Sequence, residues 1–128
     1  MNDIVLIAEH SATAIEPGAW LNTTWTIYSD RHVIINIRHN MNDARDRDLQ
    51  TVIAEDIYDE IFNTLELAKR EDRKVFVFDS TEWAFKQYIN GNQIYRRIGA
   101  AIDGLMEFEK LEAILYQVIK RAKPAGEA

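Results

Sequence analysis

Three polar side chains that could serve a reaction, those of His32, Asn36 and Arg38, lie an even number of residues apart. An even spacing places side chains on the same face of a β-strand. An imidazole, an amide and a guanidinium on one face can polarise a phosphate or carbonyl group and move a proton. The same set also suits the wet edge of a sheet or the rim of an interface, so both interpretations stay open.

Residues 24–39 predict the β-hairpin that would position this row, because two runs of β-branched and aromatic residues flank a polar break. With Asp30 and Arg31 at the tip, Tyr28 would lie opposite Val33. One face would then hold Trp25, Ile27, His32, Ile34, Asn36 and Arg38. The other would hold Thr24, Thr26, Tyr28, Val33, Ile35 and Ile37. Both faces carry large apolar side chains, so we expect a central hairpin with one face under helices and the other in a ligand pocket, a dimer interface or a partner contact.

A second hairpin is predicted over residues 83–98, since Asn90 and Gly91 tolerate the positive φ of a tight turn. Its core face is expected to carry Trp83, Phe85, Ile89, Ile94 and Ile98. Its wet face is expected to carry Lys86, Tyr88, Tyr95 and Arg97. Exposed tyrosine beside basic side chains is typical of a contact surface.

The spacing of apolar residues predicts helices over residues 54–70 and 104–122, the second capped by Asp103. Short apolar runs predict further strands at residues 4–8, 49–53 and 74–78. The order of strand, hairpin, helix, strand, hairpin and helix indicates an α+β protein. We expect an antiparallel sheet of about five to six strands, with both helices packed on one side.

Size and composition narrow the class of protein. The 128 residues predict one domain over residues 1–122 and a frayed tail over 123–128. A net charge of −6 argues against nucleic-acid binding, which needs clustered basic residues. The absence of cysteine excludes disulfides and thiolate chemistry and fits a reducing compartment. The apolar run 4–8 is too short for a signal peptide and no run is long enough to span a membrane, so we expect a cytoplasmic protein.

No metal site, cofactor or catalytic residue is predicted. Asp43, Asp46 and Asp48 are spaced like metal ligands, but Arg45 and Arg47 stand between them and the glycine of a calcium loop is missing. The serines lie in no strand-to-helix G-x-S-x-G elbow, and the five glycines do not cluster into a phosphate-binding loop.

A set of motifs over residues 24–119 resembles a known pattern. These motifs are Tyr28-Ser29-Asp30-x-x-Val33, Asp79-x-x-x-Trp83, Tyr88-x-x-Gly91-Asn92 and Leu111-Glu112-x-Ile114-Leu115. Together they resemble a family of small uncharacterised bacterial α+β proteins with Y-S-D-G-x-V and D-G-x-x-W strand pairs. Arg31 and Ser80 stand where that family carries glycine. The resemblance implies the fold and no activity.

Two functions of different classes remain. The first is a non-enzymatic binding protein that uses an exposed sheet face for self-association as a homodimer, or for a protein partner as inhibitor or immunity-type proteins do. The second is a small-molecule binding protein or small hydrolase using the row of Trp25, His32, Asn36 and Arg38. The candidate ligand or interface residues are Trp25, His32, Ile34, Asn36, Arg38, Lys86, Tyr88, Tyr95 and Arg97. A concave pocket at the row would favour the second function, and a flat face would favour the first.

Overall fold

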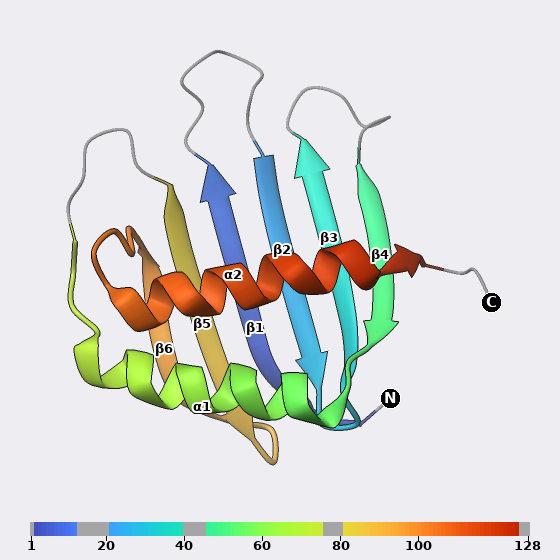
Figure 1. The fold of residues 1–128 in the computed structure, drawn as a ribbon, viewed down its shortest axis with the longest axis horizontal. Helices are drawn as coiled ribbons and strands as arrows, with labels where there is room; N and C mark the ends of the chain where they lie inside the picture. The colour runs from blue at the N-terminus through green and yellow to red at the C-terminus, as the bar shows by residue number, and fades with distance from the viewer. Residues whose placement is uncertain (1, 13–20, 40–45, 76–80, 126–128) are drawn as a thin grey trace.

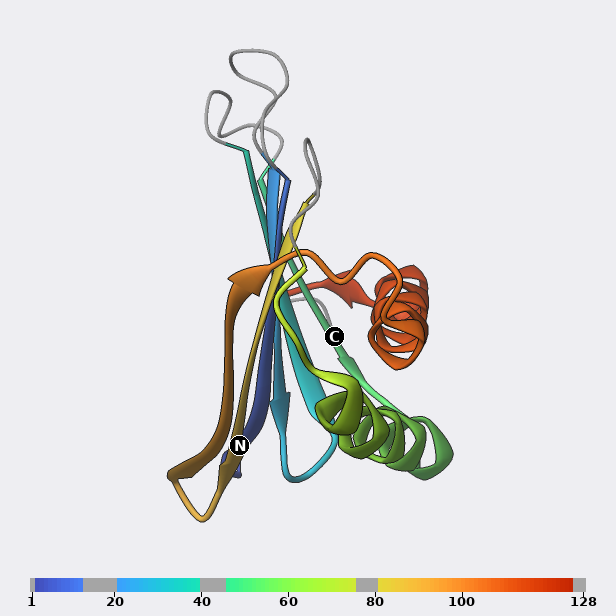
Figure 2. The ribbon, with the colours of Figure 1, turned by 90° about the vertical axis from the view of Figure 1, so that its left-hand side faces the viewer.

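A computed structural model of the chain describes residues 2–12, 21–39, 46–75 and 81–125. It shows an α+β fold in which seven antiparallel strands form one open sheet in the order β6-β5-β1-β2-β3-β4-β7. The strands are β1 (Ile4–Ala12), β2 (Leu21–Tyr28), β3 (His32–His39), β4 (Arg47–Val52), β5 (Glu82–Ile89), β6 (Asn92–Ala100) and β7 (Lys123–Pro124). The helices α1 (Glu55–Glu71) and α2 (Met106–Arg121) cross the same face of the sheet, as Figures 1 and 2 show. The α+β class is as predicted, with seven strands in place of five to six.

The turn between β2 and β3 sets which side chains face the helices. Arg31 has a φ of 72° and donates its backbone N–H to the carbonyl of Tyr28 at 2.9 Å. The loop therefore contains three residues, and Ile27 pairs with Val33. The predicted two-residue tip was wrong by one residue, and a slip of one residue moves every side chain of a strand to the other face. The prediction missed the third loop residue because Arg31 adopts a left-handed conformation. This conformation costs free energy in a non-glycine residue and is uncommon.

The hairpin of β5 and β6 turns as predicted. Asn90 and Gly91 have φ values of 50° and 81°, so the loop has two residues and Ile89 pairs with Asn92. The faces of β6 differ from the prediction, because the register shifts between the pairs Tyr88–Gln93 and Gln87–Tyr95. One extra residue on β6 at this bulge reverses the faces beyond it.

The bulge explains where the side chains of this hairpin lie. Trp83 and Phe85 are fully buried under the helices, as predicted. Ile94 and Ile98 were predicted on the core face, yet they are 49% and 70% exposed. Arg97 was predicted on the wet face, yet it is buried. Ile89, also predicted in the core, lies exposed at the end of its strand.

The two helices occupy nearly the predicted segments, but α2 starts differently. Asp103 does not cap it: the residue before the helix is Leu105, and no side-chain cap bond forms there. The Glu71 carboxylate at the end of α1 instead accepts the backbone N–H groups of Glu107 and Phe108, at 2.7 and 3.2 Å. A carboxylate satisfies two of the free N–H groups at a helix start and interacts well with its dipole. The end of α1 therefore fixes the start of α2.

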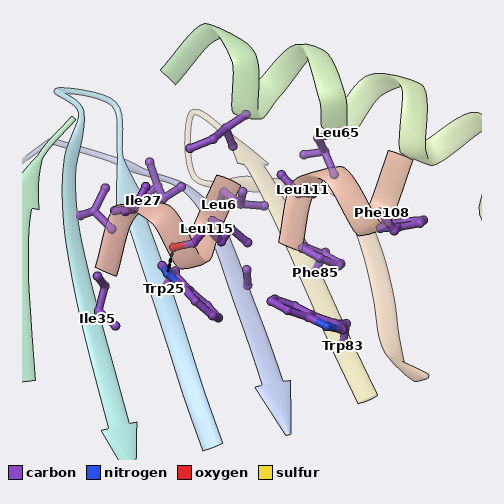
Figure 3. Close-up of a cluster of buried hydrophobic side chains, with 14 of the residues drawn as sticks. Leu6, Trp25, Ile27, Ile35, Leu65, Trp83, Phe85, Phe108, Leu111 and Leu115 are labelled. Atoms are coloured by element: carbon purple, nitrogen blue, oxygen red, sulfur yellow. Dashed lines mark hydrogen bonds between the residues drawn. The ribbon is translucent and has the colours of Figure 1, made fainter. Parts of the chain in front are cut away.

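The core lies between the sheet and the helices. Its largest fully buried side chains are Trp25, Trp83, Phe85 and Phe108. Figure 3 shows the tryptophans and Phe85 projecting from the sheet towards α2, with Leu65 of α1 above. The indole N–H of Trp25 donates to the Leu115 carbonyl at 2.9 Å, which anchors α2 to β2. This bond satisfies a buried donor that would otherwise be costly.

Two segments differ from the sequence prediction. Residues 123–125 were expected to fray, but Lys123 and Pro124 form β7 beside β4, and the Ala125 N–H donates to the Asp48 carbonyl at 2.7 Å. A strand was expected over residues 74–78, but Lys74 and Val75 are not in a strand. The rest of that segment lies outside the described residues.

Candidate functional site

The structure separates the residues of the predicted row. Trp25 is fully buried under α2, whereas His32, Asn36 and Arg38 project from the opposite face of the sheet. Ile34 lies with them on this opposite face. We call it the open face, because neither helix covers it (Figure 2). The pairing of Trp25 with this row was wrong, since it depended on the two-residue turn.

The second group of candidates is divided in the same way. Lys86 and Tyr88 lie on the open face. Tyr95 and Arg97 lie on the helix face, where the Tyr95 hydroxyl donates to Asp72. Burial raises the pKa of Tyr95 above its ordinary value, and the hydrogen bond to the Asp72 carboxylate raises it further. Tyr95 and Arg97 therefore do not form part of a contact surface on the open face.

The strand pairings arrange the open-face side chains in four rows across the sheet. The first row, at the turn end of β2 and β3, is Tyr88, Ile4, Tyr28, His32 and Val52. The second row is Arg96, Lys86, Ile7, Thr26, Ile34 and Gln50. The third row is Ala84, Glu9, Thr24, Asn36 and Asp48. The fourth row is Glu82, Ser11, Asn22 and Arg38.

The rows differ in chemistry along the strands. The first two rows carry most of the large apolar and aromatic side chains of the open face, with Val52 62% exposed and Ile34 and Ile7 half-buried. The second row also carries Lys86 and Arg96 on β5 and β6, and the third and fourth rows carry mainly hydroxyl, amide and charged groups. Antiparallel sheets often leave one face in water, but such faces are normally polar. An apolar half-face next to a polar one is typical of a contact surface.

A hydrogen-bonded group occupies the β3–β4 corner of the open face. Asp48 accepts the side-chain amide of Asn36 at 2.7 Å and the guanidinium of Arg38 at 2.6 Å. The hydrogen bond from Asn36 is the largest cause that lowers the pKa of Asp48, and the hydrogen bond from Arg38 is the next. The amide and guanidinium that were considered for catalysis are therefore engaged with a carboxylate on an exposed surface.

Two cavities formed by the described residues can be compared with the row, and neither includes His32, Asn36 or Arg38. The first, of about 210 Å³, lies between the start of α1 and the end of α2. It is lined by Thr51, Val52, Ile53, Ala54, Ile57, Glu60, Ile114, Gln117, Val118 and Arg121. The second, of about 390 Å³, is lined by Asp72, Arg73, Lys74, Arg96, Arg97, Ile98, Gly99 and Ala100. The row lines neither of these cavities, whereas a pocket at the row was the condition for a small-molecule or hydrolase function.

Arg97 belongs to an extensive polar network at the end of α1. Its guanidinium Nε donates to Asp72 at 2.9 Å, and the group lies 4.8 Å from the centre of the Phe108 ring. Its other nitrogens donate to the carbonyls of Arg73, Trp83, Ala100 and Ala101. These bonds tie the end of α1 to β6 and to the segment before α2. Arg97 is therefore a structural residue.

Sequence reasoning did not place His10, which lies in a second polar cluster. Its Nδ1 is 2.6 Å from the Tyr116 hydroxyl, and its Nε2 is 2.7 Å from the Thr81 hydroxyl. The ring stacks on Trp83 with a centroid distance of 4.3 Å. A neutral imidazole satisfies two hydroxyl neighbours by donating from one nitrogen and accepting at the other. The hydrogen-bond partners of His10 lie 71 and 106 residues away along the chain, so the local spacing of residues gave no indication of this cluster.

Burial of the imidazole lowers the pKa of His10 below its ordinary value of 6.5. The unfolded chain therefore takes up a proton at this site at a higher pH than the folded chain does. We predict that the free energy of unfolding falls as the pH drops below about 6.5. Urea titrations at about pH 5 and about pH 7.5 measure the fall, and it should be smaller in His10→Gln. An equal fall in both proteins would contradict this role of His10.

The described residues contain no group of three or more acidic or histidine side chains placed to hold a metal ion. Within the same ranges, neither helix has the length and apolar character needed to cross a lipid bilayer. Comparison with models of known protein families and with curated proteins finds no match to the chain. The functional assignment therefore depends on the geometry of the open face.

Proposed function

We propose that this chain is a non-enzymatic binding protein that uses the open face of its sheet to associate with a second copy of itself. The single observation that carries the proposal is the apolar half of the open face, formed by Ile4, Ile7, Tyr28, Ile34 and Val52 on adjacent strands. Both helices lie on the other face, so no element among the described residues covers it. Apolar surface of this extent is stabilised when it is removed from water.

The polar groups of the face support binding over catalysis. Asn36 and Arg38 are held by Asp48, and His32 lies in the apolar first row. A hydrolase would need a nucleophile and a base that converge beside a water-excluded pocket. A flat face with aromatic side chains and a polar margin fits protein association.

We predict that Ile34→Lys leaves the domain folded and converts a dimer to a monomer. Ile34 lies in the middle of the open face, so an ammonium group there would be desolvated only when two copies associate. Ile35, its neighbour on the strand, is fully buried in the core. Ile35→Lys should therefore unfold the domain. Sedimentation equilibrium gives the mass in solution, and circular dichroism reports folding.

The matched control is Leu67→Lys, because Leu67 is also a partly exposed apolar side chain but lies on α1. This variant should remain a dimer. An Ile34→Lys protein that stays folded and keeps the mass of the unmodified protein would refute the open face as the contact. An unmodified protein that is monomeric would refute self-association and would leave a different protein partner as the occupant to seek.

A further inference from the structure

We infer that the two copies are related by a two-fold axis that runs along the strands and lies between β1 and β2, so that the two open faces pack as a sandwich. This inference rests on the proposed function and adds the symmetry of the contact. It follows from the position of the rows, the balance of charge on them and the area that they offer.

The six long strands divide evenly about the boundary between β1 and β2. The strands β6, β5 and β1 lie on one side of it, and β2, β3 and β4 lie on the other. Symmetric dimers use the same patch on both copies. A residue on one side of the axis therefore meets the residue of the second copy that lies in the same row, at the same distance on the other side of the axis. An axis at this boundary uses the whole face.

The charges on the face favour a second copy as the occupant. The chain carries a net charge of −6, which opposes association through most of its surface. The four rows, however, contain three acidic and three basic residues, so their formal charge is zero. These residues are Glu9, Asp48, Glu82, Arg38, Lys86 and Arg96. Two open faces can therefore meet without net repulsion.

The direction of the axis follows from the order of the rows. An axis along the strands places each row on the same row of the other copy, so the apolar first row covers itself. In the fourth row, Glu82 then lies opposite Arg38 of the partner subunit, because the two residues are on strands equally distant from the axis. An axis across the strands would instead place the first row on the fourth. That arrangement would bury Glu82 and Arg38 against apolar side chains, at a cost in desolvation.

The area of the face is sufficient for a stable dimer. Six strands of about eight residues, about 4.8 Å apart and with a rise of about 3.3 Å, cover about 750 Å². Standard interfaces bury about 800 Å² per partner. Packed sheets lie about 10 Å apart with their strands inclined by about 30°, and the twist of an open sheet suits this arrangement.

Single cysteines test the axis, because the chain contains no cysteine of its own. Ser11 lies in the fourth row on β1, beside the axis, and Gln50 lies in the second row on β4, far from it. For an axis along the strands, we expect a distance of about 11 Å between the two copies of Ser11 and about 26 Å between the two copies of Gln50. For an axis across the strands, these distances become about 22 Å and about 12 Å.

A bismaleimide linker of about 10 Å is added to the folded Ser11→Cys and Gln50→Cys proteins, and covalent dimer is measured on a denaturing gel. We expect most of the Ser11→Cys protein to become covalent dimer. Gln50→Cys should stay at the level of the cysteine-free protein. Adding Ile34→Lys to Ser11→Cys should remove the cross-link, because this axis places residue 34 opposite Lys86 of the partner subunit and two like charges would meet.

The mass of each cysteine variant in solution separates the inference from the proposed function. A dimer in which Gln50→Cys cross-links and Ser11→Cys does not would overturn the axis and keep the open face as the contact. A dimer in which both or neither cross-link would also overturn the axis. If the variants and the unmodified protein are all monomeric before the linker is added, the proposed self-association itself fails.

Discussion

Trp83→Ala is expected to lower the free energy of unfolding by about 3 to 5 kcal/mol. The indole is fully buried and stacks against three rings, those of His10, Trp25 and Phe85. Its N–H also donates to Glu112 of α2 at 2.9 Å. Alanine would leave a cavity between the sheet and α2 and would remove the floor beneath His10. A urea titration monitored by circular dichroism measures the loss.

The matched control is Met106→Ala, which shortens a side chain of α2 that is 69% exposed. It should change the free energy of unfolding by less than about 0.5 kcal/mol. Both variants are compared with the unmodified protein at one chain concentration, because unfolding of a dimer depends on concentration. A loss below about 1 kcal/mol for Trp83→Ala would show that the centre of the core has been misassigned.

Arg97→Met should destabilise the domain by about 3 kcal/mol, although methionine fills a similar volume. The guanidinium is buried, and its loss would remove one of the two side-chain donors to Asp72 and the donors that it supplies to several carbonyl groups. A partner that stays buried without its hydrogen bond pays the full cost of desolvation. Thermal unfolding followed by calorimetry measures the effect.

Two further variants test whether the network, and not the volume, is responsible. Arg97→Lys should rescue little, because a single ammonium group cannot reach carbonyls that a planar guanidinium reaches on several sides. Arg97→Met combined with Asp72→Asn should lose less stability than the sum of the single changes, since the two side chains interact directly. Full additivity would contradict the coupling of α1 to β6 through this pair.

The elements that local patterns determine could be predicted from the sequence. The stripes of α1 and α2 repeat with helical spacing, and the structure buries Ile61, Leu65, Leu111 and Leu115 from them. The tight turn at Asn90 and Gly91 was also predicted, because its residues tolerate positive φ. Apolar spacing and turn chemistry act over a few residues, so a sequence displays them directly.

The faces of the strands could not be predicted reliably, because a single residue decides them. Arg31 adopts a left-handed conformation that its type does not favour, and this lengthens the first turn. A bulge in β6 leaves no mark in the apolar pattern, yet it turns Tyr95 and Arg97 towards the helices. The candidate site therefore kept His32, Ile34, Asn36, Arg38, Lys86 and Tyr88, and it lost the three side chains that the structure places in or beside the core.

The two faces of the sheet have different roles. Trp25 and Trp83 belong to one layer, where they hold α2 on the sheet. The open face retains most of its large apolar side chains in the first two rows, and its formal charges balance over the four rows together. The same sheet thus separates a structural face from a face that is free to bind, and a second copy is the occupant that we propose.

The most direct test of this account is the native mass of the protein purified from the cells that produce it, because one spectrum reports both assembly and any bound molecule. We predict a species of two chains with no additional mass, which dissociates to single chains on dilution. A single chain across the accessible concentration range, alone or carrying another molecule, would contradict the central claim that the open face of the sheet binds a second copy.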